Sequence, residues 1–430
     1  MFKSLLAALA CAVATLSGNA MAQGKEIKIG VIYDLTGPFA DSGSYGAYLG
    51  AKYAIDIINE RGGVEGYKIK PIYADAQSKV EVAINEAERL LNQEKVDVLL
   101  GLYSSSQCIP LSQKVEQAKK LLWTGTCTSS AVFKDRGLKY TFRVMVDSDQ
   151  FGPASCGLLN SVSQSKLGKD PKDLKVALIY EDGPYGVGST AGLESACKGY
   201  GMQVVLKEGY SASTPDLSSL VTKLKRANAD VILHTGQSQD VFLFLRQARS
   251  QNLKWSALIG HGGAYGQIDK LYATFKDDVD YVFDTEPVGA QILDQSKMAP
   301  GLSDLVKDIT RRYKADVKNN NVVSPTLSMG FNAAWVFFSD VMPRAIKKYG
   351  GVDPESLRKA AMETDIPDGG TIQGTGVKFY PPGHRMEGQN ERATMPIVQY
   401  DKGQSYLVWP LSIRTKEPVI PLPKGHPYAP

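Results

Sequence analysis

The chain carries the same alternation of strand-like and helix-like segments twice in succession. The first copy has strand-like apolar runs, separated by helical patterns, at 27–33, 68–73, 96–100 and 121–123. The second copy has them at 175–180, 202–206, 231–233 and 257–260. Strands that alternate with helices predict parallel sheets covered by helices. We therefore expect an α/β fold of two Rossmann-like lobes, each built on a mainly parallel sheet.

The remainder of the chain does not continue this alternation. Two helical patterns cover 302–318 and 326–349, and short strand-like runs follow at 377–380, 396–400 and 406–409. The last residues, 417–430, contain five prolines. Proline-rich segments lack the backbone donors of regular structure, so this end is expected to be an extended strap or a disordered tail.

Residues 1–22 have the pattern of a cleaved signal peptide. Lys3 precedes an apolar run from Leu5 to Leu16, and Ala20-Met21-Ala22 has small residues where signal peptidase requires them. A helix kept in the mature protein and a lipoprotein cysteine at Cys11 are the alternatives. No later run reaches the roughly 18 apolar residues of a membrane span. We expect a soluble protein exported to the periplasm.

Charge and motifs point to binding rather than to catalysis. The 49 Lys and Arg residues against 45 Asp and Glu give a net charge of +4, which provides no basic excess for nucleic acid. Complete nucleophile-elbow, zinc-protease, Walker A and Cys-x-x-Cys motifs are missing, and the four histidines are scattered. The expectation is a protein that is not an enzyme, without a cofactor or metal. A hydrolase using Ser104 or Ser189 is the alternative.

Four cysteines follow the signal peptide: Cys108, Cys127, Cys156 and Cys197. An oxidising compartment permits disulfides, and four cysteines allow three pairings. Pairing between neighbours in the sequence, Cys108–Cys127 and Cys156–Cys197, keeps each bridge within one β/α unit. Four buried thiols are the alternative, because free cysteine is commonly buried.

Two hydroxyl-rich loops follow neighbouring strands of the first copy. Ser104-Ser105-Ser106 comes after the strand at 96–100, and residues 124–130, with Thr126 and Thr128, come after the next strand. Ligands of open α/β sheets bind beyond the carboxyl ends of the strands, and a helix N-terminus favours an anion. The loops can therefore hold one carboxylate through neutral hydrogen bonds. Simple helix capping also explains their composition.

Other strand-end loops add candidate contacts. Ser42 lies in the loop after the first strand, Tyr185 in the loop after 175–180, and Gln237 beyond 231–233. Tyr185 can lay its ring on an apolar ligand. Turn formation and ordinary packing are the alternatives for these positions.

Several segments, in this order, resemble the leucine/isoleucine/valine-binding type of periplasmic solute-binding protein, the receptor of an ABC importer. They are Ile29-Gly30-Val31 with Leu35-Thr36-Gly37-Pro38, the helix end Asp56–Val64, Ser104-Ser105-Ser106, Tyr180-Glu181-Asp182 with Tyr185-Gly186, and Leu245–Arg249. The resemblance covers Lys25 to about Trp409.

The resemblance implies a type I periplasmic binding protein fold whose two lobes close on a ligand around three crossovers. We place the crossovers at 146–149, 281–286 and 376–380. Lobe 1 then comprises 23–146 plus 284–377, lobe 2 comprises 147–283 plus 378–412, and 413–430 is the proline-rich tail. The implied partners are a small carboxylate ligand, held by Ser104, Ser105, Thr126 and Thr128, and an inner-membrane permease. A monomer is expected, and a sensor for a signalling partner is the alternative role.

The chain departs from amino-acid-binding members in one loop. Those members carry a carboxylate for the ligand's ammonium after the strand that is here 258–260, and this chain has Gly260-His261-Gly262-Gly263 instead. A buried ammonium without a charged partner is costly. We therefore expect an acid without an α-amine, with an aromatic acid favoured and His261 donating to a ring hydroxyl. A solvated histidine in a surface loop is the alternative for His261. If the ligand is a branched-chain or other amino acid, another acid such as Asp182 or Glu286 must replace the missing one.

Overall fold

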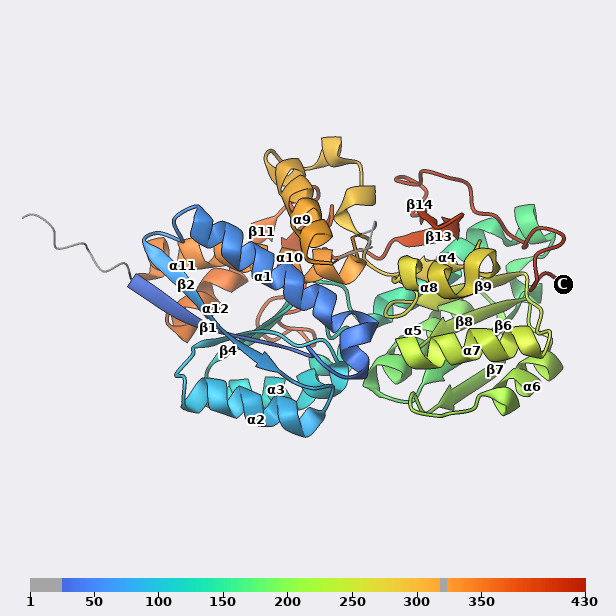
Figure 1. Ribbon diagram of the computed structural model, residues 1–430, viewed down its shortest axis with the longest axis horizontal. Coiled ribbons are helices and arrows are strands. Elements are labelled where there is room, and N and C mark those ends of the chain that lie inside the picture. The colour runs from blue at the N-terminus through green and yellow to red at the C-terminus, as the bar shows by residue number, and fades with distance from the viewer. Residues whose placement is uncertain (1–24, 318–322) are drawn as a thin grey trace, which may run out of the picture.

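The computed structural model describes residues 25–317 and 323–430 and has two lobes side by side along the long axis of the molecule (Figure 1). The expected signal peptide, with Cys11, lies outside the described residues. None of the helices within these two ranges is long and apolar enough to cross a membrane.

Lobe 1 is built on a five-stranded sheet in the order β2-β1-β3-β4-β5. All four pairings in this sheet are parallel. The strands are β1 (Lys25–Tyr33), β2 (Tyr67–Asp75), β3 (Val98–Gly101), β4 (Leu121–Thr124) and β5 (Thr141–Arg143). Helices α1 (Tyr45–Glu60), α9 (Leu302–Asp316), α10 (Pro325–Val336), α11 (Met342–Tyr349) and α12 (Pro354–Met362) share one apolar core with the sheet. Helices α2 (Val80–Asn92) and α3 (Ser105–Ala118) contribute to the core on its other face.

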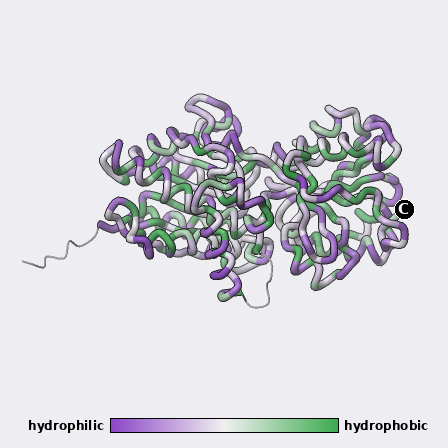
Figure 2. The backbone as a smooth tube through the Cα atoms, turned by 90° about the horizontal axis from the view of Figure 1, so that it is seen from above, coloured by the Kyte–Doolittle hydropathy of each residue, from purple (hydrophilic) through white to green (hydrophobic). Residues whose placement is uncertain are grey.

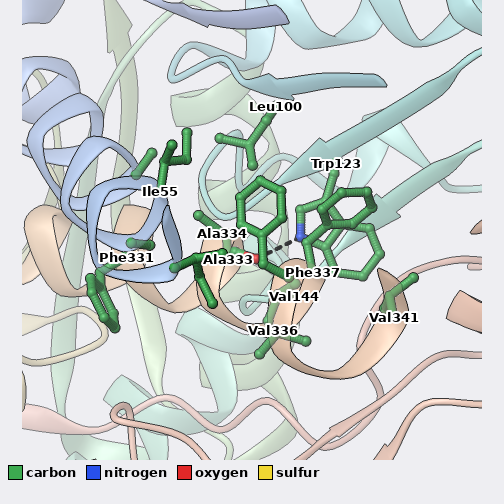
Figure 3. Packing of buried hydrophobic residues seen from close by; sticks show 14 of the residues in the cluster. Ile55, Leu100, Trp123, Val144, Phe331, Ala333, Ala334, Val336, Phe337 and Val341 are labelled. Atoms are coloured by element: carbon green, nitrogen blue, oxygen red, sulfur yellow. Dashed lines mark hydrogen bonds between the residues drawn. The ribbon is translucent and has the colours of Figure 1, made fainter. Parts of the chain in front are cut away.

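Trp123 on β4 is the centre of the larger of these cores. Its indole Nε1 donates to the Ala333 carbonyl of α10 over 2.8 Å, and its ring centroid lies 5.2 Å from that of Phe337 (Figure 3). A fully buried indole with a satisfied N–H fixes the spacing between sheet and helix. This packing holds the carboxyl end of β4, from which one of the hydroxyl-rich loops leaves.

Lobe 2 is built on a seven-stranded mixed sheet in the order β14-β13-β10-β9-β8-β6-β7. Its parallel strands are β6 (Lys175–Glu181), β7 (Gln203–Tyr210), β8 (Val231–Thr235), β9 (Ala257–His261) and β10 (Phe283–Thr285). The antiparallel edge is formed by β13 (Ile397–Asp401) and β14 (Gln404–Trp409). Helices α4 (Phe151–Val162) and α5 (Pro184–Gly199) join one core. Helices α6 (Ser218–Ala227), α7 (Ser238–Ser250) and α8 (Ile268–Phe275) join the other.

Each lobe has its own hydrophobic interior, and hydrophilic segments lie on the outside of both (Figure 2). This agrees with the expected α/β fold of two lobes with mainly parallel sheets. A lobe with its own core can move as a unit relative to its neighbour.

The chain passes between the lobes three times, after β5, after β10 and before β13. The third passage differs from the expected one at 376–380. Phe379 stays in lobe 1, with its ring 5.5 Å from that of Trp123, and Gln389 forms a bridge with Arg143. Ala393 and Met395 are the first residues of this segment in a lobe 2 core. The short pair of strands β11 (Asp365–Ile366) and β12 (Val377–Lys378) keeps this part of the chain on lobe 1.

The four cysteines form two disulfides between neighbours in the sequence. Cys108–Cys127 joins α3 to the loop after β4 in lobe 1, and Cys156–Cys197 joins α4 to α5 in lobe 2. Each bridge stays within one lobe.

Of the two forms expected for the C-terminal segment, the structure shows the strap. Tyr428 is buried and stacks on Trp255 with a centroid distance of 4.1 Å, and its carbonyl accepts from the Trp255 N–H over 3.0 Å. Ile420 and Leu422 are also buried against lobe 2. The apolar residues between the prolines account for this attachment, because burying them stabilises the packed form.

Candidate ligand-binding cleft

The carboxyl ends of the parallel strands of both lobes face each other, and a cavity of about 130 Å³ lies between them. Lobe 1 contributes the loops after β3 and β4, and lobe 2 the loops after β6, β8, β9 and β10. This is the position at which open α/β sheets bind ligands. The small volume suits a compact molecule.

The lobe 1 wall carries hydroxyl groups. Ser104, Ser105 and Thr128 line the cavity, and Ser104 occupies the N-cap position of α3 with an extended backbone. The Ser104 and Ser106 hydroxyls are 2.7 Å apart, and Ser105 Oγ accepts from the Ser129 N–H over 3.1 Å. These hydroxyls can rotate to donate to an anion at the positive end of the helix.

The disulfide Cys108–Cys127 ties the two hydroxyl-rich loops together. Cys108 lies in the first turns of α3, and Cys127 lines the cavity between Thr126 and Thr128. Thr126 also lines the cavity, but its hydroxyl donates to the Leu102 carbonyl. Thr126 therefore braces the loop, whereas Thr128 presents its side chain at the wall.

A buried cation stands behind this wall. Arg143 is fully buried, and its guanidinium donates to the carbonyls of Cys127 and Ser129. Burial lowers its pKa to about 10, so Arg143 is charged at neutral pH. The guanidinium holds the shape of the loop that carries Thr128 and adds positive potential on the hydroxyl side of the cleft. The supporting role of Arg143 could not be recognised from the sequence, because it depends on contacts with carbonyls 14 to 16 residues earlier in the chain.

The lobe 2 wall carries acids and aromatic rings. Glu181, at the end of β6, accepts from the N–H groups of Gly183 (2.6 Å) and Gly186 (2.8 Å), at the start of α5. Tyr185 lines the cavity with its ring, and its hydroxyl donates to the His261 carbonyl over 2.6 Å. Burial raises the pKa of Glu181, and the two backbone N–H groups act in the opposite direction.

Glu286 is the least compensated of the acids at the cavity. It follows β10, it is 5 % exposed, and within the described chain its Oε2 has no hydrogen-bond partner. Burial and the nearby charge of Asp284 hold its pKa well above the ordinary value. Gln237 also lines the cavity with an Oε1 that lacks a partner among the described residues. Buried acceptor oxygens without partners favour a ligand that carries hydrogen-bond donors.

Gly262 and Gly263 explain why the loop after β9 has no acid. Both have positive φ, 51° and 53°, a backbone region that side chains rarely adopt. A Cβ on Gly262 would lie 2.7 Å from the Tyr185 hydroxyl. The loop therefore approaches the cavity with its backbone, and Glu286 from the next strand brings the carboxylate.

The expected contacts divide into two groups. One group comes together around the cavity and consists of Ser104, Ser105, Thr126, Thr128, Tyr185 and Gln237. The cavity is also lined by residues outside the expected contacts, among them Phe39, Tyr103, Phe151, Glu181, Glu286 and Met329. Among the described residues, those that line the cavity include no Lys, Arg or His. The sequence points to Glu286 only as a substitute for the missing acid, and its place directly after a strand is the signal available for it.

His261 and Ser42 do not line the cavity. His261 is fully buried in lobe 2, where its Nε2 pairs with Ser155 Oγ and its Nδ1 with Thr235 Oγ1, both over 3.1 Å. Burial lowers its pKa to about 3, so the ring is neutral. A ring with both nitrogens engaged inside the lobe cannot donate to a ligand hydroxyl, which corrects that expectation.

Ser42 instead joins the two lobes at the mouth of the cleft. Its Oγ accepts from the Ser238 N–H at the start of α7 over 3.1 Å, and the Ser238 hydroxyl donates to the Asp41 carbonyl over 3.3 Å. Lys270 on α8 also donates to the Asp41 carbonyl, over 3.0 Å. The lobes are therefore in contact in front of the cavity, which is a closed arrangement.

Comparison with known proteins agrees with this geometry. Residues 26–405 match the model of a family described as periplasmic binding protein. A Leu/Ile/Val-binding protein homolog 7 from Brucella abortus is 32% identical over 413 residues, which cover 96% of this chain and 98% of that protein.

Solved structures of the same fold hold different ligands. The branched-chain amino acid transporter substrate-binding protein LivJ from Streptococcus pneumoniae, in complex with isoleucine, matches with a TM-score of 0.70 and 19% identity. The alignment covers 89% of this chain and 98% of LivJ. A solute-binding protein of an ABC transporter from R. palustris, in complex with benzoate, matches with a TM-score of 0.72 and 14% identity. That alignment covers 89% of this chain and 95% of the other.

Proposed function

Because this chain belongs to the periplasmic binding protein family, we propose that it is the substrate-binding protein of an ABC importer and that its ligand is an α-amino acid. The family binds solutes rather than converting them, so the cleft is a binding site and not a catalytic one. The substrate follows from the chemistry of the two cleft walls.

The observation that carries the proposal is the position of Glu286. A buried carboxylate is costly without a cation, and the residues that line the cavity with Glu286 provide none. A ligand ammonium supplies the missing charge and donors. Glu181 and the unpaired Oε1 of Gln237 lie on the same wall and extend the acceptor side.

The opposite wall fits the other end of an amino acid. Ser104, Ser105 and Thr128 supply hydroxyls at the N-terminus of α3, and Arg143 supports them from behind. Hydrogen bonds to a charged group contribute about 1.5–3 kcal/mol each. Phe39, Tyr103, Phe151 and Met329 form apolar walls for an aliphatic or aromatic side chain.

An acid without an amine is the second candidate. It is favoured by the raised pKa of Glu286, because a protonated Glu286 is uncharged and needs no cation. The aromatic rings at the cavity suit a flat acid such as benzoate. This candidate does not explain the acceptor Oε1 of Gln237.

The same proposal includes the setting of the protein. Residues 1–22 direct export to the periplasm and are removed, the ligand closes the two lobes, and the closed monomer delivers it to a permease in the inner membrane. For the lobe boundaries we keep 23–146 in lobe 1, begin its second segment after β10 instead of at 284, because β10 belongs to the lobe 2 sheet, and extend that segment to about residue 392. This extension rests on the contacts of Phe379 and Gln389.

The test uses two ligands that differ only in the amine. Leucine and 4-methylpentanoate are titrated by calorimetry into mature protein that has been unfolded, dialysed and refolded, with benzoate and cinnamate alongside. Tight binding of leucine and weak binding of 4-methylpentanoate supports the proposal. Tight binding of benzoate or 4-methylpentanoate with no response to leucine contradicts it and favours the second candidate.

A further inference from the structure

A second cavity lies between the lobes at the hinge. Its volume is about 470 Å³, larger than that of the cleft cavity. All three passages between the lobes contribute to its wall: Met145 and Val146 after β5, Pro287 after β10, and Ala393, Thr394 and Pro396 before β13. Pro287 lines the cleft cavity as well. Any rotation of one lobe against the other must change the shape of this cavity.

Much of the wall is apolar. Met298 packs against the lobe 1 core and Leu293 against a lobe 2 core, and Leu407 and Ile413 come from lobe 2. Ile413 is a large hydrophobic side chain at 39 % exposure, so apolar surface extends to the mouth. Exposed apolar surface that lines a cavity is typical of a binding site.

One buried polar group points to the chemistry of an occupant. Gln373 lines the cavity at 5 % exposure, and its Nε2 has no hydrogen-bond partner within residues 25–317 and 323–430. A buried amide donor without an acceptor costs about 1–3 kcal/mol. An occupant with an acceptor oxygen removes that cost.

The charged groups of the wall balance one another. Lys297 lies 3.7 Å from Asp294, and Arg414 lies 2.5 Å from Glu417. The remaining acid, Asp368, accepts from the Gly376 N–H over 2.9 Å. The wall therefore favours an occupant with an acceptor oxygen and does not select for a particular net charge on that occupant.

We propose that this hinge cavity, defined by Gln373, Leu407, Ile413 and the three passages between the lobes, binds a second small molecule that has an apolar body and an acceptor oxygen. This site is distinct from the cleft and does not depend on the identity of the cleft ligand. The cavity exists in the arrangement in which Ser42 and Ser238 hold the lobes together. An occupant that fits it stabilises that arrangement and raises the affinity of the cleft for its own ligand, and the coupling is reciprocal.

The test uses three eight-carbon probes: 2-octanone, octanoate and octylamine. The first two carry an acceptor oxygen and differ in charge, whereas octylamine carries a charged donor. Calorimetry on the mature protein is expected to show binding of 2-octanone or octanoate at least fivefold tighter than octylamine. Octylamine binding as tightly as both others contradicts the role of Gln373.

Three variants locate the binding. Ile413→Trp fills the mouth and is expected to abolish probe binding, whereas Leu411→Trp, in the same loop at 49 % exposure and outside the wall, leaves it unchanged. Gln373→Leu is expected to remove the preference for an acceptor oxygen. Equal probe binding by Ile413→Trp and the unchanged protein overturns the proposal.

A cleft variant separates this proposal from the previous one. Thr128→Val is expected to bind 2-octanone as the unchanged protein does, whatever its effect on the cleft ligand. Saturating the hinge cavity of the unchanged protein is expected to tighten the cleft ligand about fivefold, within the usual range of coupling between sites. Probe binding that is lost in Thr128→Val places the probe in the cleft and contradicts the hinge site.

Discussion

The two lobes share an architecture but present opposite chemistry to the cleft. Lobe 1 offers hydroxyls on loops joined by a disulfide, with the buried cation Arg143 behind them. Lobe 2 offers Glu181, Glu286 and Gln237, with its disulfide away from the cavity between α4 and α5. A cavity with a donor end and an acceptor end therefore forms only where the two lobes meet.

The disulfides give the largest expected effect and compare the lobes directly. Cys108→Ser/Cys127→Ser and Cys156→Ser/Cys197→Ser open loops of 19 and 41 residues and are each expected to lower the free energy of unfolding by about 3–4 kcal/mol. Urea denaturation measures this loss. Only the first pair is expected to weaken ligand binding as well, because Cys127 lies in the wall. Each double variant is the control for the other. Equal ligand affinities of the two double variants would contradict a role of the lobe 1 disulfide in the binding site.

Glu286→Gln tests the acceptor end. The variant leaves a ligand ammonium without its charge partner, so we expect about 2–4 kcal/mol of lost binding energy for leucine, roughly 30- to 1,000-fold in Kd. Asp182→Asn, an exposed acid beside Glu181, is the matched control. Calorimetry that finds leucine affinity unchanged in Glu286→Gln would show that lobe 2 does not recognise an amine through this residue.

Thr128→Val tests the donor end. Losing one hydrogen bond to a charged group is expected to cost about 1.5 kcal/mol, roughly tenfold in Kd, for leucine and for any response to 4-methylpentanoate. Thr222→Val, on the exposed surface of α6, is the control. If Thr128→Val no longer binds leucine but still binds 4-methylpentanoate, the assignment of the two walls would be reversed.

The pH dependence of stability is the smallest effect and belongs to lobe 2. Burial raises the pKa of Asp240 from 3.8 to about 8, and burial also raises that of Asp284. Between pH 3.8 and about 8 the native protein therefore holds protons that the unfolded chain has released. The contribution of each of these two acids to the free energy of unfolding falls as pH rises through this range, by at most about 1.4 kcal/mol per pH unit. The buried neutral rings of His234 and His261, whose pKa is lowered to about 3, contribute a slope of the opposite sign below pH 6.5.

Asp240→Asn is expected to remove the contribution of Asp240 to the slope, because the amide does not titrate. Asp304→Asn, an acid on α9 whose side chain is 81% exposed, is expected to leave the slope unchanged. Urea denaturation at pH 5, 6 and 7 measures both. A slope that is the same in Asp240→Asn as in the unchanged protein would contradict the assignment of Asp240 as protonated in the native state.

Local patterns predicted the frame of the molecule. The apolar run at 96–100 became the buried strand β3, and the serine triplet after it became the start of α3 beside the cleft. Cys108 and Cys127 paired as neighbours because their β/α units are adjacent in the sheet. These features depend on side-chain alternation and on short loops, which a sequence displays directly.

Longer-range contacts decided the rest. His261 belonged to the expected site by its place after a strand, but Ser155 and Thr235 bind its ring inside the lobe. The family resemblance places the third crossover at 376–380 and so puts residues 378–392 in lobe 2, yet Gln389 holds this segment to Arg143 of lobe 1.

Sequence patterns were therefore enough to predict the two α/β lobes, the pairing of neighbouring cysteines and the hydroxyl loops, since each depends on residues close together in the chain. The packing of the lobes was needed to place Glu286 at the cavity, to set Arg143 behind the opposite wall, and to form a cavity at the hinge. These features join residues more than a dozen positions apart, and how such residues meet depends on the packing of whole lobes rather than on any local pattern.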